Sequence, residues 1–119
     1  MIMRTRIVAA VLFAVVSVAP LLADRRMDAK AQVEFGWSVA EKGLWKEAMY
    51  RFLKAVEIDP TYAAAWNNLG ITYEQAGQFE DAKKAYEKAV KLDPTNQYIH
   101  QNYDMFREIY DRTHSRRSR

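Results

Sequence analysis

The 119-residue sequence contains no cysteine, only four glycines and three prolines, and two histidines. Without cysteine the chain has no disulfide framework, zinc finger, iron–sulfur site or thiol nucleophile. The histidines, His100 and His114, lack the four-residue spacing that lets one helix face hold a metal ion. Neither a glycine-rich phosphate loop nor a Gly-x-Ser-x-Gly turn is present. We therefore expect a protein that is not an enzyme and that uses no cofactor, metal or small-molecule substrate.

Charge is distributed unevenly along the chain. The net charge is +3, yet residues 24–111 hold 12 Lys and Arg against 15 Asp and Glu, a net of −3. The basic surplus lies at the two ends. Residues 112–119 carry four arginines, and we expect them to be a disordered basic tail. Such a tail can bind anionic lipid, and the alternative is that it binds no partner at all. Nucleic acid is disfavoured because no aromatic residue lies among the arginines.

The N-terminus has the pattern of a secretory signal. Arg4 and Arg6 precede the apolar run of residues 7–22, and Ala23 precedes the first acidic residue. Leu21 stands where a small residue is preferred before cleavage. Residues 1–23 are therefore interpreted as a cleaved signal peptide or an uncleaved membrane anchor. The third interpretation is a soluble cytoplasmic protein whose N-terminal segment is apolar.

The remainder of the chain repeats itself with a period of 34 residues. A shift by that number superposes glycines, alanines, aromatic residues and an Asp-Pro-Thr sequence: Gly36 on Gly70, Gly43 on Gly77, Ala48 on Ala82, Phe52 on Tyr86, Ala55 on Ala89, and residues 58–61 on residues 92–95. A period of this length is typical of helical units that stack into a solenoid.

This pattern resembles the tetratricopeptide repeat, whose consensus is W-x2-L-G-x2-Y, then A-x3-F or Y, x2-A and a closing proline. Residues 63–96 match it completely, at Trp66, Leu69, Gly70, Tyr73, Ala82, Tyr86, Ala89 and Pro94. Residues 29–62 keep most of the pattern but have Gln32 and Val39 in place of Trp and Tyr. The resemblance implies an all-α helix–turn–helix solenoid of two repeats plus a C-terminal capping helix.

The glycines have two expected roles. Gly43 and Gly77 are predicted to end helices in the left-handed conformation that glycine adopts at little cost. Gly70 is predicted to let its helix approach the next one near Ala82, and Gly36 to do the same one repeat earlier. Beyond the second repeat, residues 97–111 form one amphipathic stripe and are predicted to be the capping helix, after a linker at residues 24–28 and the repeats at residues 29–62 and 63–96.

The resemblance implies a concave groove lined by the first helix of each repeat. Some relatives clamp peptide C-termini with Lys, Arg and Asn, but only Asn68 of that clamp matches here. We expect instead a helical or extended peptide with apolar anchors and some basic character. The alternative for Trp37 is that it plugs the exposed end of the stack. The candidate groove residues are Val33, Trp37, Asn67, Asn68, Ile71, Gln75, Tyr98, Asn102 and Met105.

A second candidate surface lies on the second helix of the first repeat. This helix has apolar residues where the second repeat has charged ones, namely Met49, Tyr50 and Leu53. An exposed apolar cluster on a small domain marks a contact, unless residues 24–28 fold back over it. Two repeats are also fewer than such arrays need for stability, so we expect association with itself or with a larger complex.

These observations predict a non-catalytic protein–protein interaction module. We expect an adaptor or accessory subunit of a cell-envelope complex, exported to the periplasm or envelope. The alternatives are a structural subunit held in the inner membrane by an uncleaved N-terminal helix, and binding to anionic lipid through the tail.

Overall fold

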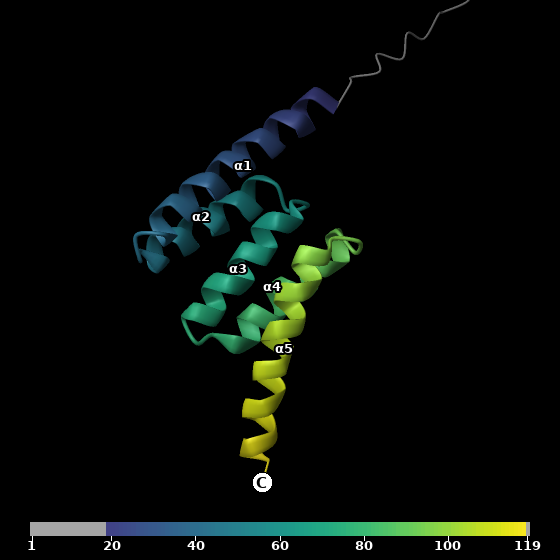
Figure 1. Cartoon of the computed structure of the whole chain (residues 1–119). Coiled ribbons are helices and arrows are strands. Elements are labelled where there is room, and N and C mark those ends of the chain that lie inside the picture. The colour runs from purple at the N-terminus through teal and green to yellow at the C-terminus, as the bar shows by residue number, and fades with distance from the viewer. Residues whose placement is uncertain (1–18, 119) are drawn as a thin grey trace, which may run out of the picture.

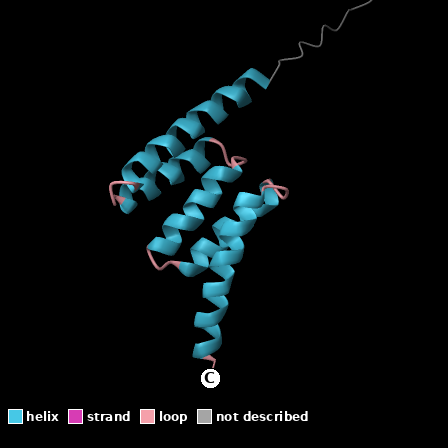
Figure 2. Ribbon diagram, viewed as in Figure 1, coloured by secondary structure: helices cyan, strands magenta, loops and turns pink. Residues whose placement is uncertain are grey.

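The computed structural model describes residues 19–118, and this part of the chain contains α-helices and no strand (Figure 1). Short loops join the helices (Figure 2). The elements are α1 (Ala19–Ala40), α2 (Trp45–Ile58), α3 (Ala63–Gln75), α4 (Phe79–Leu92) and α5 (Gln97–Arg117). α1 packs on α2, α3 packs on α4, and α2 contacts α3. The predicted all-α repeat solenoid, with two helical hairpins followed by a last helix, is confirmed.

Glycine ends the first helix of each repeat as predicted. Gly43 has a φ of 78° and Gly77 a φ of 72°, both in the left-handed region. The N–H of Gly43 donates to the carbonyl of Ala40, and the N–H of Leu44 donates to that of Val39. These two bonds form a Schellman motif, which satisfies carbonyls that the end of a helix leaves free.

The other two glycines make room for aromatic rings. A Cβ built on Gly70 would lie 2.7 Å from Cδ1 of Tyr86, and one built on Gly36 would lie 2.5 Å from Cε1 of Phe52. The atoms nearest to a Cβ at Gly70 are therefore those of the Tyr86 ring. A ring laid flat on a glycine fills the space between the helices of one repeat.

Residues 24–28 are not a separate linker, because they belong to α1. Arg26 explains why this stretch is ordered. Its guanidinium donates through Nε to Asp59, and through Nη2 to the Thr61 hydroxyl at 3.1 Å. Ala29, which directly follows the stretch, is fully buried. Arg26, which lies three residues before the first repeat, thus ties α1 to the loop between α2 and α3.

The predicted signal or anchor at residues 1–23 lies mostly outside the described residues, which begin at residue 19. Of that segment, residues 19–23 form the first turns of α1. Between residues 19 and 118, none of the helices is both long enough and apolar enough to span a bilayer.

The C-terminal segment 112–119 is not disordered over its described part, since α5 continues to Arg117. Contacts with α4 account for this extension. The Tyr110 hydroxyl donates to Glu80 of α4, and Nε2 of His114 lies 3.5 Å from the same carboxylate. The arginines of the last turn also favour a helix, because cations stabilise the negative end of its dipole.

Candidate functional site

The first helices of the repeats and the last helix form one layer. α1 contacts α3, and α3 contacts α5, so these helices lie side by side (Figure 1). All the predicted groove residues come from this layer. Gln75, Tyr98 and Met105 are exposed, whereas Trp37, Ile71 and Asn102 are half-buried.

The predicted groove residues Val33, Asn67 and Asn68 are buried, so they do not form an open wall. Val33 belongs to the core beneath the first repeat. Asn102 donates through Nδ2 to Oδ1 of Asn67 at 3.1 Å, which joins α5 to α3. A buried amide needs such a partner, because an unpaired polar group in the interior is costly. Asn67 and Asn102, which the repeat pattern placed in a binding groove, therefore hold two helices together.

Trp37 packs against the core of its own repeat. Its ring meets Phe52 edge to face, with 5.7 Å between centroids. This geometry is the favourable one for two aromatic rings. Trp37 therefore covers Phe52 and remains partly accessible to solvent.

The apolar residues of α5 are the most open part of this layer. Met105 is 65% exposed, Tyr98 is 58% exposed and Ile109 is 44% exposed. Beyond them, Ile109, Arg112, Thr113 and Arg116 line a shallow hollow of about 220 Å³. The basic end of this surface was missed from the sequence, because the arginines were expected to be in a disordered tail. Their spacing relative to Ile109 was the available signal.

Glu74 lies in this layer but is engaged with a neighbouring helix. Its carboxylate accepts a hydrogen bond of 2.9 Å from the Tyr86 hydroxyl. Burial, together with the negative charge of Glu74, raises the pKa of Tyr86 well above its usual range. The phenol stays protonated and acts as a structural donor.

The predicted contact patch on α2 divides into two parts. Met49 is half-buried against the core, where it lines a hollow of about 210 Å³ with Gln75 of α3. Tyr50 is 50% exposed and Leu53 is 41% exposed. Residues 24–28 do not fold back over Tyr50 and Leu53, because they continue α1 toward the far end of α2.

The described part of the chain holds no group of three or more His, Cys, Asp or Glu side chains placed to bind a metal ion. Tyr86, Tyr103 and Tyr110, whose pKa values are raised, each pair with a carboxylate at a helix contact. These pairs lie between helices and do not converge on a cavity.

Comparison with known families gives two matches. The family model described as "Tetratricopeptide repeat" matches residues 63–96, and one described as "TPR repeat" matches residues 39–77. No curated protein matches the chain. The two family matches support a tetratricopeptide repeat protein, and such repeats indicate a protein–protein interaction module.

Proposed function

We propose that this tetratricopeptide repeat protein is a non-catalytic adaptor or accessory subunit of a cell-envelope complex. It binds a peptide or partner protein along the open surface of the layer formed by α1, α3 and α5. One observation carries this proposal: Tyr98, Met105 and Ile109 are all exposed on one face of α5. Apolar side chains grouped in this way on a small domain mark a contact surface.

The proposed binding surface is formed by the residues of this layer that are not fully buried. The α5 residues form its apolar wall, with Ile71 and Gln75 of α3 beside them in the same layer. The hydrogen bond between Asn67 and Asn102 holds α3 and α5 together. A partner therefore meets a preformed surface and does not have to order it, which lowers the entropic cost of binding.

The cell-envelope location rests on the sequence of residues 1–23. A second candidate role, a subunit anchored in the inner membrane, is favoured by the course of α1. This helix continues through Ala23 and Asp24, so the expected cleavage position lies inside a helix. Mass spectrometry of the N-terminus from the native host distinguishes the two roles: Asp24 as the first residue supports export with cleavage, and a retained residue 7–22 segment supports anchoring.

Peptide selection tests the binding surface. A displayed library of random 16-residue peptides is selected on the full chain, and the enriched peptides are measured by titration. We expect their affinity to fall with Met105→Glu or Tyr98→Glu. Tyr50→Glu is the matched control, since Tyr50 is similarly exposed but lies on α2. Loss with the α2 variant alone would assign binding to the α2 patch, and failure to enrich any peptide would contradict the proposed function.

A further inference from the structure

α5 carries two stripes with the same spacing, and only one of them is covered. Ile99, Tyr103, Phe106 and Tyr110 follow a spacing of four, three and four residues, and Ile99 and Phe106 are buried. The second stripe, which we call the α5 stripe, has the same spacing and is exposed throughout. Its members are Met105, Ile109, Arg112 and Arg116.

α1 also carries an uncovered stripe of this spacing. The α1 stripe consists of Asp24, Asp28, Ala31 and Phe35, and each of these residues is exposed. One repeat later, the positions of Ala31 and Phe35 are taken by Ala65 and Leu69. These residues are 0% and 1% exposed, because α2 packs on α3 there.

The repeat register therefore identifies the apolar half of the α1 stripe, Ala31 and Phe35, as a face that a helix covers one repeat later. The two exposed faces differ in how their charges are placed. In the α1 stripe the acidic residues come first and the apolar residues follow, whereas in the α5 stripe the apolar residues come first.

The charged ends of both stripes are available for pairing. Among the described residues, Asp24, Asp28 and Arg116 form no ion pair. Arg112 pairs with Glu108 of its own helix at 3.3 Å, on the surface. Arg26, two residues from both Asp24 and Asp28 in the sequence, pairs with Asp59 instead. Both stripes span about 16 Å along their helices, at 1.5 Å per residue.

We propose that the α5 stripe of one molecule binds the α1 stripe of a second copy, with the two helices antiparallel. This arrangement places every charge opposite its complement and every apolar residue opposite another. The resulting pairs are Asp24 with Arg116, Asp28 with Arg112, Ala31 with Ile109, and Phe35 with Met105. The inference rests on the proposed function, since it names an occupant for the open face of α5.

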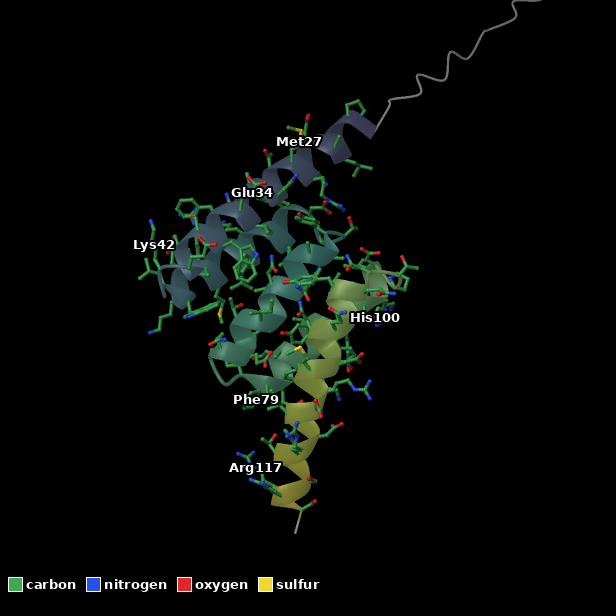
Figure 3. All side chains as sticks on the ribbon, viewed as in Figure 1. Met27, Glu34, Lys42, Phe79, His100 and Arg117 are labelled. Carbon is green, nitrogen blue, oxygen red and sulfur yellow. The ribbon has the colours of Figure 1, made fainter. Side chains whose placement is uncertain are left out.

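The two stripes lie too far apart to be joined within one molecule. Met27 of α1 and Arg117 of α5 appear at opposite ends of the molecule (Figure 3). A contact between different faces of two copies leaves one stripe free at each end, so the association is head to tail and is not limited to a dimer. With few apolar residues in each stripe, the interface is small and the association is weak.

Cysteine cross-linking of the full chain tests this pairing, since the natural sequence contains no cysteine. One chain carries Ala31→Cys and a second, with a tag of different size, carries Ile109→Cys. A disulfide requires Cα atoms within about 7 Å, so mild oxidation joins the two chains only if these residues face each other. Leu53→Cys paired with Ile109→Cys is the control for random collision, because Leu53 is exposed on α2.

A charge exchange tests the register. We expect Asp24→Arg to slow the 31–109 cross-link about fivefold, and Arg116→Asp in the partner chain to restore it. Arg117→Asp is the matched control. It changes the charge by the same amount as Arg116→Asp and lies at the same end of α5, but on a different face of the helix. It should not restore the cross-link.

The outcomes separate this inference from the proposed function. The proposed pairing of copies is overturned if Ala31→Cys and Leu53→Cys cross-link to Ile109→Cys equally well. It is also overturned if Arg116→Asp does not restore the cross-link that Asp24→Arg slows. If library peptides still bind at Met105 in that case, the proposed function stands and the partner is another protein. If neither peptides nor a second copy bind, both proposals fail.

Discussion

The two repeats carry equivalent residues at equivalent positions, but they differ in what covers those residues. Leu69 of the second repeat is 1% exposed, whereas Phe35, its counterpart in the first repeat, is 47% exposed. The reason is that α2 lies against α3, while no described helix precedes α1. Phe35 is contacted instead by the Arg51 guanidinium, 4.3 Å from the ring centroid. The consensus thus determines the helical hairpin, and the place in the array determines which consensus residues are buried.

The aromatic residue on each interhelical glycine shows the same contrast. Phe52 contacts Trp37 within its own repeat. Tyr86 reaches further: its hydroxyl bonds to α3, and its ring packs against Tyr103 and Phe106 of α5. Tyr86 therefore links three helices.

The largest expected effect comes from deleting these rings. Phe52→Ala and Tyr86→Ala should each lower the free energy of unfolding by about 3–5 kcal/mol, because both remove a fully packed aromatic side chain. We expect Tyr86→Ala to have the larger effect, since it also releases α5. Urea denaturation followed by circular dichroism measures both.

A conservative variant refines this comparison. Tyr86→Phe keeps the ring and removes only the hydrogen bond to Glu74, which should cost about 0.5–1.5 kcal/mol. An equal effect of Phe52→Ala and Tyr86→Ala would contradict the view that Tyr86 links α5 to the repeats.

The second prediction tests how burial depends on place in the array. Leu69→Ala should cost about 2–5 kcal/mol, as expected for a buried leucine. Phe35→Ala should cost less than about 1 kcal/mol, because the residue is half exposed and loses mainly its contact with Arg51. Comparable losses, measured at low concentration where copies do not associate, would show that Phe35 is covered by something outside the described chain.

The third prediction compares the two kinds of glycine. In Gly70→Ala the new Cβ meets a ring packed on its other side, so we expect a loss of about 1–3 kcal/mol. In Gly77→Ala there is open space, and the cost of about 1–2 kcal/mol comes from the positive φ alone. Adding Tyr86→Leu to Gly70→Ala should recover part of the stability that Gly70→Ala loses. Adding it to Gly77→Ala should recover none, and thermal melts of the two double variants measure this difference.

Most of the architecture follows from the sequence, because glycine, proline and apolar residues recur in one register. The two helix ends at Gly43 and Gly77 were predictable from this pattern alone. The partner of Gly70 was not, because spacing places two helices together without fixing which side chain fills the gap. Only the volume of the Tyr86 side chain indicated that its ring fills this gap.

The candidate binding surface was less predictable than the fold. Asn67 and Asn68 are polar residues at concave positions, and polarity alone suggests exposure. Asn67 is satisfied by a hydrogen bond from Asn102 of another element, and it donates in turn to Asn68. The ordered end of α5 likewise depends on Glu80 of α4, a contact between residues 30 positions apart in the sequence. Local composition does not contain such long-range contacts.

The smallest predicted effect concerns the turns that follow the two hairpins. Asp59 and Asp93 occupy the same position, but only Asp59 is held by Arg26 from the first turns of α1, while Asp93 accepts from Asn96 at 3.0 Å. Burial opposes ionisation of Asp59, yet hydrogen bonds from Thr61 and Arg26 outweigh it and lower the pKa of that carboxyl below 3.8.

A carboxyl whose pKa is lowered by folding adds stability above its unfolded pKa, and this stability is lost as pH falls through the folded value. Asp59→Asn should therefore destabilise the protein at pH 7, and the difference from the natural chain should shrink as the pH is lowered from about 5 to about 2. Arg26→Gln should show the same trend, because it removes the cation that favours the ionised form. Urea denaturation at a series of pH values measures both variants. A loss that stays constant down to pH 2 would mean that the Asp59 carboxylate contributes only the shape of the turn, and that the first turns of α1 are held by the packing of Ala29 instead.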